Sequence, residues 1–286
     1  MTNDTEEHAQ PFGPLDAILP KDMAKRAERA GAEKAEQEGL SLLALAGLAG
    51  AYIAFGATFA AAVTAGAEPM TGVTKLAGGF AFTLAYVLAI VGGAELFTTN
   101  VLTVMAWAHG RLPTLRLLRA WAIVFVGNFL GAAATGGLLI AAGQHWGIDG
   151  AVGASLLASA ASLASHAPLQ ALLLGVLGNT LLCLGVWLTY SARTTTDRVL
   201  ALTPPVAAFY VLGLEHAVAV MFYLPCAAFI GLFAGPDFWA QIGAEPLGLG
   251  VGDFFAVLLP VTAGNVLGGG VLVALMYWFI YLRPKR

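Results

Sequence analysis

The sequence predicts an all-α integral membrane protein with six transmembrane helices, arranged as two inverted three-helix repeats. Of its 286 residues, 58% are hydrophobic and 11% are charged, whereas about a quarter of the residues of a soluble domain are charged. The apolar runs span roughly 20 residues or more, the length of a membrane helix, and lack the ten-residue alternation of an outer-membrane barrel. The 35 glycines also suit membrane helices, because small residues let helix backbones approach closely.

Three segments are predicted along the chain: a polar tail at 1–41, a transmembrane pore domain at 42–282 and a short basic tail at 283–286. The first tail has no basic stretch followed by an apolar core, so it does not resemble a cleavable signal peptide. Residues 1–14 are predicted to be disordered. Residues 16–38 have many alanines and mixed charges, which predicts an amphipathic helix, solvated on the membrane face.

Glycines interrupt two of the six predicted spans, the second near Gly92 and Gly93 and the fifth near Gly213. The segments 143–166 and 234–250 are predicted to be a polar connection and a loop. The six spans are predicted at 42–64, 76–108, 115–142, 167–190, 199–233 and 254–282.

Basic residues are distributed unevenly between the connections. The segments 143–166 and 234–250 carry none, and the first connection carries only Lys75. Because cytoplasmic loops are enriched in Lys and Arg, both termini are predicted to be cytoplasmic in a plasma (inner) membrane. Outside the tails, the remaining basic residues follow the second and fourth spans: Arg111, Arg116, Arg119, Arg193 and Arg198.

A short internal repeat supports the two-half arrangement. The sequence Gly-Asn-Phe-Leu-Gly at 127–131 in the third span matches Gly-Asn-Val-Leu-Gly at 264–268 in the sixth. Asn128 and Asn265 are interpreted as packing and hydrogen-bonding positions. The span before each pentapeptide is the interrupted one and carries a lone glutamate. Three spans per half is an odd number, so the second half must be inverted, and paired broken helices in inverted repeats indicate a transport site.

The pair Glu215 and His216 lies in an otherwise apolar run, where ionisable groups are costly and usually functional. An imidazole titrates near neutral pH, so His216 could hold or lend a proton to a permeating anion. Glu95 and Glu215 are instead predicted to support the broken helices by accepting the backbone N–H groups that the breaks free. Direct contact between a glutamate and an anion is disfavoured because like charges repel.

Polar and aromatic residues near the breaks are candidates for a substrate pathway. Thr98 could bond the permeating species or cap the helix that follows. Asn179 is a mid-span amide, for which hydrogen bonding between helices is the plainer interpretation. Phe82, Phe97 and Phe209 could narrow a pore, although aromatic residues in a span more often only pack.

The sequence contains no motif for ATP, metal or nucleic-acid binding, so no cofactor, metal or nucleic-acid partner is expected beyond the lipid bilayer. Cys183 and Cys226 are interpreted as small buried apolar residues. An intramembrane enzyme using Glu215 and His216 would need a nucleophile or metal partner that no motif supplies, so an enzyme is not expected.

The chain resembles the formate/nitrite transporter family over nearly its whole length. Four segments carry the resemblance: Gly-Ala-Glu-Leu-Phe-Thr at 93–98, Gly-Asn-x-Leu-x-Cys-Leu-x-Val-Trp at 178–187, the Glu-His pair with Met-Phe-Tyr-Leu-Pro at 215–225, and Pro-Val-Thr-Ala-Gly-Asn-Val-Leu-Gly-Gly-Gly at 260–270. The resemblance implies an aquaporin-like protomer with its own pore, a homopentamer, and a cargo of small monovalent anions such as formate, nitrite, lactate, acetate or hydrosulfide.

The resemblance also implies roles for individual residues. It implies that His216 is the central pore histidine, with Thr98 and Asn179 along the substrate pathway. It implies pore constrictions at Leu96, Phe82 and Phe209, to which the adjacent Phe97 is added as a candidate. The histidine of the family is thought to pass a proton to the anion, so that the neutral acid crosses the narrow apolar parts of the pore.

The chain departs from the family pattern at three places. Val220 stands where many members have an asparagine. The segment 143–166 has no lysine or arginine, although many members have a vestibule lysine there, and His166 is the nearby candidate to replace it. Tyr86 stands where an aliphatic residue is expected near a constriction. The main hypothesis is therefore passive or proton-coupled anion transport, with a channel for a small neutral solute as the alternative.

Overall fold

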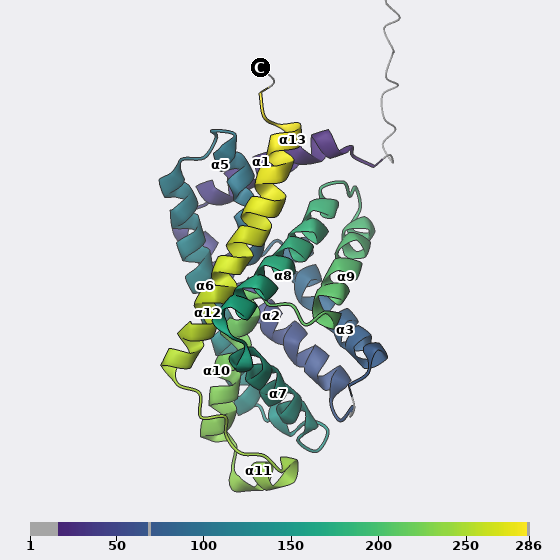
Figure 1. Cartoon of the computed structure of the whole chain (residues 1–286), viewed down its shortest axis with the longest axis vertical. Coiled ribbons are helices and arrows are strands. Elements are labelled where there is room, and N and C mark those ends of the chain that lie inside the picture. Colours follow the sequence, from purple (N-terminus) through teal and green to yellow (C-terminus); the bar gives the residue numbers. More distant parts are fainter. Residues whose placement is uncertain (1–16, 68–69, 285–286) are drawn as a thin grey trace, which may run out of the picture.

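The computed structural model describes residues 17–67 and 70–284, and every regular element in these ranges is a helix (Figure 1). By length and composition, five helices could cross a membrane. A sixth span is counted if α10 (Ala217–Phe233) and α11 (Pro236–Ile242), which are bent by 118°, are taken together. The predicted all-α membrane fold is confirmed, and its division into two inverted three-helix repeats stays a prediction. The predictions for residues 1–16, 68–69 and 285–286 lie outside the described residues.

The first half of the chain contains one broken helix between two continuous ones. The break covers residues 93–96, and shorter helical pieces follow it. The elements are α2 (Gly39–Thr64), α3 (Gly72–Gly92), α4 (Phe97–Asn100), η1 (Val101–Thr103), α5 (Val104–Ala108) and α6 (Thr114–Ala141).

The second half repeats this order. Its break covers residues 212–216, and its last helix continues through a π-helical stretch, η3. The elements are α8 (Pro168–Thr189), α9 (Thr195–Val211), α10, α12 (Val251–Asn265), η3 (Val266–Leu275) and α13 (Met276–Tyr281).

Both breaks contain a glycine in the left-handed conformation. The φ angle is +82° at Gly93 and +63° at Gly213. Glycine adopts this region without the steric penalty of a Cβ atom, and it commonly ends helices in this way. The positions predicted for the two breaks are therefore confirmed.

The two repeated pentapeptides make equivalent packing contacts. Each lies where the third span of its half meets the first: α6 packs against α2, and α12 with η3 packs against α8. A Cβ atom added at Gly131 would overlap the carbonyl oxygen of Gly47, and one added at Gly268 would overlap that of Val176. The glycine that ends each pentapeptide therefore lets two backbones touch.

The two segments predicted to be a polar connection and a loop contain helices. The connection at 143–166 contains η2 (Gln144–Trp146) and α7 (Ala151–Ser165), and the predicted loop at 234–250 contains α11. Helix α7 packs against α10 and α2. Helix α7 has 15 residues, which is too short for a membrane span. Most of the stability of a short helix comes from tertiary packing, so its neighbours stabilise α7.

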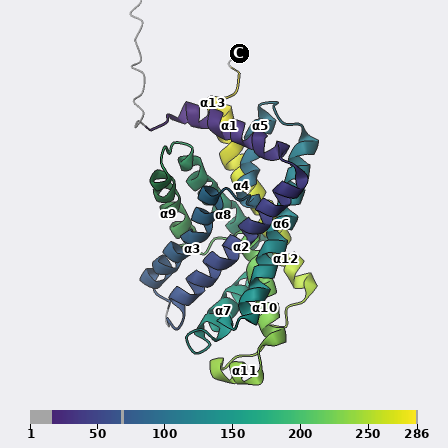
Figure 2. The same ribbon diagram turned by 180° about the vertical axis from the view of Figure 1, so that it is seen from behind.

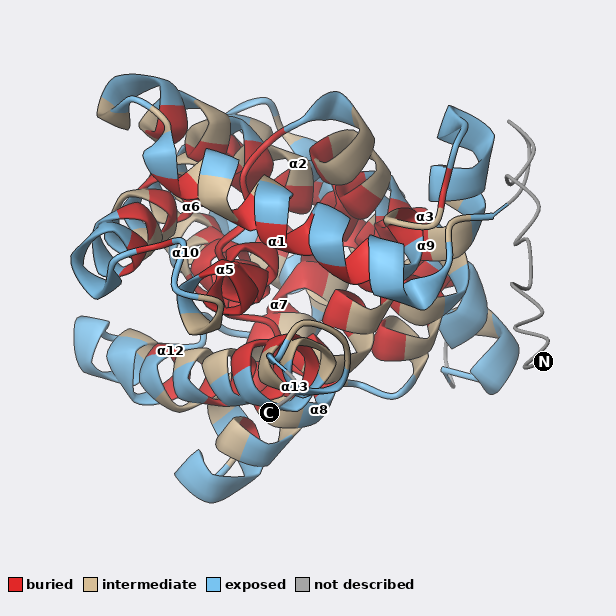
Figure 3. Cartoon of the chain, turned by 90° about the horizontal axis from the view of Figure 1, so that it is seen from above, coloured by how far each residue is buried: buried red, intermediate tan, exposed pale blue. Residues whose placement is uncertain are grey.

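Helix α1 (Pro20–Glu36) is not the solvated helix that the sequence predicts. One of its faces is buried against α5, η1, α6 and α13 (Figures 2 and 3). The buried carboxylate of Glu28 lies 2.6 Å from Nε of Arg111. A solvated helix would show no such buried face, so α1 is part of the packed domain.

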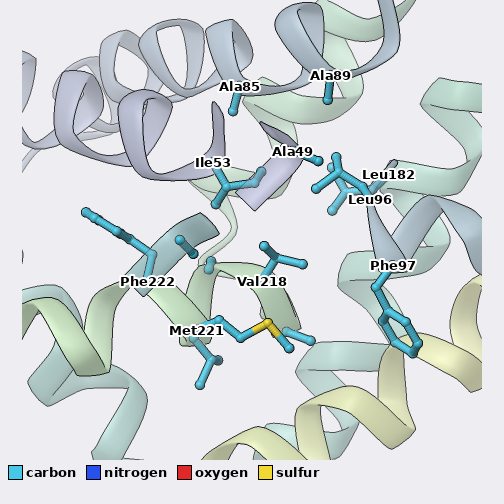
Figure 4. Close-up of a cluster of buried hydrophobic side chains, with 14 of the residues drawn as sticks. Ala49, Ile53, Ala85, Ala89, Leu96, Phe97, Leu182, Val218, Met221 and Phe222 are labelled. Carbon is cyan, nitrogen blue, oxygen red and sulfur yellow. The ribbon is translucent and has the colours of Figure 1, made fainter. Parts of the chain in front are cut away.

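Helices α1, α5 and α13 lie at one end of the molecule, and α7 and α11 lie at the other (Figures 1 and 2). Apolar side chains from both halves meet between these ends, among them Ile53, Leu96, Leu182 and Val218 (Figure 4). A route from one end to the other must therefore cross a packed layer.

Candidate functional site

Two cavities enter the helical domain. The α1-side cavity has a volume of about 320 Å³, and its lining includes Arg26, Lys34, Glu95 and Arg198. The α7-side cavity has a volume of about 470 Å³. Its lining includes aromatic, ionisable and hydroxyl side chains, among them Phe82, Phe209, Tyr223, Lys75, Glu215, His216, Ser155 and Ser159. The two cavities share no lining residue, so a closed layer separates them.

His216 lies at the inner end of the α7-side cavity and is fully buried. It is the residue before α10, and its Nδ1 accepts a hydrogen bond of 3.1 Å from the backbone N–H of Ala219. Its Nε2 lies 2.8 Å from the phenol oxygen of Tyr86 and 2.8 Å from Oγ1 of Thr98. The structure thus brings His216 and Thr98 together, as predicted, and adds Tyr86.

The ring contacts fix the tautomer of His216. A nitrogen that accepts a hydrogen bond carries no proton, so the proton of the neutral imidazole is on Nε2. A second proton on Nδ1 would face the N–H of Ala219 and replace an attraction with a repulsion. The surroundings of His216 therefore favour a neutral ring that presents Nε2–H to Tyr86 and Thr98.

Two predicted constriction residues form an aromatic wall beside this cluster. The rings of Phe82 and Phe209 are stacked with centroids 6.1 Å apart. The ring of Phe209 also meets His216 edge-on at 6.1 Å. The ring of Phe82 lies 6.4 Å from that of Tyr86. These contacts place Phe82 and Phe209 beside Tyr86 and His216. Leu96 is fully buried two residues before Thr98 and lines neither cavity.

Phe97 is directed elsewhere. Its ring packs edge-on against Trp121 at 6.0 Å and against Phe125 at 5.0 Å, both on α6. It lines neither cavity. The structure therefore gives Phe97 a packing contact with α6 and does not bring it to His216.

Asn179 is a bridge between the first break and the last helix. Its Nδ2 donates to the carbonyl oxygens of Thr98 at 2.9 Å and Asn265 at 2.8 Å. It is fully buried and lines neither cavity. Its amide therefore positions Thr98, which in turn contacts His216.

Asparagines, and not glutamates, hold the backbone of the two breaks. In the first break, Asn128 accepts from the N–H of Phe97 at 2.8 Å and donates to the carbonyl oxygens of Glu95 and Ala46 at 2.9 and 2.8 Å. The C-terminal end of the break is thereby fixed to α2 and α6. The backbone contacts predicted for the glutamates are made by asparagine amides.

The second break repeats this pattern atom for atom. Asn265 accepts from the N–H of Ala217 at 2.8 Å and donates to the carbonyl oxygens of Glu215 at 3.1 Å and Gly175 at 2.9 Å. An amide can do this because it has both an acceptor and two donors, whereas an ionised carboxylate only accepts. The predicted backbone contacts of Glu95 and Glu215 were therefore wrong.

The two glutamates pair with other side chains. Oε2 of Glu95 lies 2.8 Å from Nζ of Lys34 on α1 and accepts from Nδ2 of Asn100 at 2.8 Å. Oε1 of Glu215 lies 3.1 Å from Nδ1 of His166. Each carboxylate is nearly completely buried, and an unpaired buried charge would be costly. Glu95 thus attaches α1 to the first break, and Glu215 faces the end of α7.

Three cationic residues of the site could not be recognised from the sequence. Lys34 and Arg26 belong to a helix predicted to be solvated, yet both line the α1-side cavity. Lys75 lines the α7-side cavity, although it belongs to a connection with no other basic residue. Only their place in the fold distinguishes them from other surface charges. Val220, the first departure from the family pattern, is buried and lines neither cavity.

Comparison with known proteins identifies the family. Residues 21–279 match the family model described as formate/nitrite transporter. The chain belongs to the formate/nitrite transporter family. Its relatives in this family include the formate channel FocA of Escherichia coli strain K12, 40% identical over 277 residues that cover 95% of this chain and 97% of that protein. FocA of Haemophilus influenzae is 34% identical over 270 residues, covering 92% of this chain and 95% of the relative.

Solved structures of this family share the fold. A pentameric formate channel with formate bound is 41% identical, with a TM-score of 0.80 over 86% of this chain and 98% of that chain. A channel of the same family at 23% identity gives a TM-score of 0.78 over 91% of this chain and 98% of that one, which shows the fold alone. The chain is a multi-pass membrane protein, and its relatives are channels and transporters, so an intramembrane enzyme is set aside.

Proposed function

We propose that this protein transports small monovalent anions such as formate or nitrite, passively or coupled to protons, through a pore in each protomer with His216 at its centre. The observation that carries the proposal is the donor cluster of His216, Thr98 and Tyr86 between two cavities that enter from opposite ends. The relatives named formate channels support the choice of cargo.

The charges of the α1-side cavity favour anions. Arg26, Lys34 and Arg198 line it with a single carboxylate, Glu95, whereas the lining of the α7-side cavity has one lysine, Lys75, and one carboxylate, Glu215. Cationic side chains in a cleft raise the local anion concentration and the rate of entry. The excess of cationic side chains in the α1-side cavity favours an anion over a neutral solute as cargo, and Lys75 is a cation of the α7-side cavity that lies outside the lysine-free segment 143–166.

The donor cluster can receive an anion that has shed its water. A bare anion in an apolar layer is costly unless hydrogen bonds replace its hydration. Nε2–H of His216 and the hydroxyls of Thr98 and Tyr86 are such donors. Hydrogen bonds to a charged partner are about twice as strong as those between neutral groups. The anion therefore crosses the closed layer where these three groups meet.

Proton coupling has a structural requirement. An imidazolium ring needs a proton on Nδ1, where the N–H of Ala219 now donates. A proton can therefore pass through His216 only if the ring first turns away from Ala219 or if the start of α10 moves. Coupled transport thus involves a rearrangement at the second break, whereas passive transport needs only donation from Nε2–H.

The proposal includes a homopentamer in the inner membrane with both termini in the cytoplasm. The matched structure that is a pentameric formate channel supports the assembly. Helices α5 and α8 end beside α1 and α13 (Figure 1). The chain that follows them carries the basic residues Arg111, Arg116, Arg193 and Arg198. Because cytoplasmic loops are rich in Lys and Arg, this end is assigned to the cytoplasm. Native mass spectrometry of the purified protein tests for five subunits.

Flux into proteoliposomes with internal pH recorded tests the proposed cargo. Formate, nitrite, lactate and hydrosulfide are offered in turn, with glycerol as a neutral solute and protein-free vesicles as the control. Entry of formate or nitrite at a rate well above that of empty vesicles is expected, together with slow entry of glycerol. Entry of glycerol without any anion would contradict the proposal and favour the neutral-solute channel.

A further inference from the structure

We propose that Tyr86 is a ligand of the transported anion and a determinant of which anions pass. The hydroxyl of Tyr86 supplies a hydrogen bond to the anion, and its ring limits the space beside His216. The inference rests on the proposed function, because it names the residue that gives that transport its selectivity. Three features of the structure carry it: the place of Tyr86 on α3, the balance of donors around it and the packing of its ring.

Tyr86 stands between the two cavities on α3, which, like α9, contributes lining residues to both. On α3, Phe82 lines the α7-side cavity and Ala89 lines the α1-side cavity. Residues four and three positions away lie on the same helix face, so Tyr86 is between them. At a rise of about 1.5 Å per residue, the interval from Phe82 to Ala89 is only about 10 Å along the axis. An anion that leaves one cavity for the other along α3 must pass Tyr86.

The cluster has more protons than acceptors. Because Nδ1 of His216 accepts from Ala219, Nε2 carries a proton and only donates. Three donors, Nε2–H and the two hydroxyls of Tyr86 and Thr98, then share two acceptor oxygens. A closed ring of three hydrogen bonds would need Nε2 to accept, so at least one O–H is left without an acceptor inside the cluster.

No other group of the described residues takes up the surplus proton. Each of the two hydroxyls, of Tyr86 and of Thr98, has its hydrogen-bond contact with Nε2 of His216. Both residues and His216 are completely buried, so water does not accept it either. An unsatisfied buried donor is costly. An anion brings the missing acceptor, and therefore the cluster is complementary to an anion and not to a cation.

The ring of Tyr86 makes the passage narrow. It lies 6.4 Å from the ring of Phe82 and meets the imidazole edge-on at 5.9 Å, and it is among the largest side chains with almost no exposed surface. An anion can enter this layer only as the phenol turns aside. The smaller the anion, the smaller this displacement, so the ring favours formate and nitrite over lactate.

Two substitutions separate the hydroxyl from the ring. Tyr86→Phe keeps the ring and removes the donor, so the half-saturating formate concentration should rise about tenfold, as expected for one hydrogen bond to a charged ligand. Tyr86→Leu also shortens the side chain, so the ratio of lactate flux to formate flux should rise severalfold. Tyr277→Phe removes a phenol that stacks on Trp187, away from both cavities, and should match the wild type.

The experiment measures concentration-dependent uptake in proteoliposomes for the four proteins, each confirmed as an intact oligomer. NMR spectra of the ring-labelled tyrosines are recorded with and without formate. The signal of a tyrosine with a purely structural role would not shift when formate is added. Tyr86→Phe should remove one formate-sensitive signal. If Tyr86→Phe has the same half-saturating formate concentration and the same selectivity as the wild type, this inference is overturned. Formate flux in the wild type would still uphold the proposed function in that case. No uptake and no formate-sensitive signal in the wild type would overturn both.

Discussion

Replacing Asn265 with alanine should destabilise the protein more than any change at an ordinary polar position. The side chain of Asn265 is fully buried and makes three hydrogen bonds to backbone atoms of α8 and the second break. Alanine makes none of them. The variant tests whether an amide, and not the neighbouring glutamate, holds the broken helix in place.

The size of the effect follows from which groups lose their partners. The carbonyl oxygen of Gly175 belongs to α8 and keeps its helical hydrogen bond, whereas the N–H of Ala217 and the carbonyl oxygen of Glu215 lie at the break. A buried polar group without a partner costs about 1–3 kcal/mol, so two such groups correspond to about 2–6 kcal/mol. Asn128→Ala should have an effect of similar size, because Asn128 makes the same three contacts in the first break.

Thermal unfolding in detergent measures the difference. Thr203→Ala is the matched control: the Thr203 hydroxyl donates to the carbonyl oxygen of Val199 within α9, and its loss leaves no buried N–H without a partner. Asn265→Ala and Asn128→Ala should both melt well below the wild type, and Thr203→Ala should melt close to it. An Asn265→Ala variant as stable as Thr203→Ala would refute the clamp.

Three further predictions concern charges. Lys34→Met should speed proteolytic cleavage of α1 and lower the melting temperature, because the buried carboxylate of Glu95 loses its cationic partner; unchanged cleavage would show that α1 docks without this pair. Lys75→Gln should lower formate uptake about twofold at low ionic strength and have no effect at high salt, since attraction by an exposed charge is screened; a loss that is independent of salt would contradict the attraction. Burial lowers the pKa of His145, whose ring packs against Phe238 at 5.1 Å. The unfolded chain therefore binds more protons below about pH 6.5, so stability should fall as the pH falls there, and His145→Phe should show a smaller decrease in melting temperature between pH 8 and pH 5.

The features that the sequence predicted correctly are those set by local chemistry. The two breaks could be placed because Gly93 and Gly213 adopt a backbone conformation that other residues disfavour. His216 could be singled out as a buried residue at the second break because an ionisable group is rare in an apolar span, and its role in transport stays a prediction. The presence of several helices able to cross a membrane follows from the length of the apolar runs, and the division into six spans stays a prediction.

The features that the sequence did not predict depend on contacts between distant residues. Lys34 and Glu95 are 61 positions apart, and Tyr86 and His216 are 130 positions apart. Nothing at either position reveals the partner, so α1 was predicted to be solvated and Tyr86 was recognised only as a departure from the family pattern. Helix α7 was missed for the same reason, because its neighbours and not its composition stabilise it.

The central claim is that His216 lies on the path of the anion and its proton. Its most direct test is formate-driven proton movement into proteoliposomes, compared between the wild type and His216→Asn. Asparagine is a favoured residue before a helix, so the variant should keep α10 and its oligomer. Formate should carry protons inward in the wild type, and this movement should be lost in His216→Asn. Equal proton movement in the two proteins would contradict the claim.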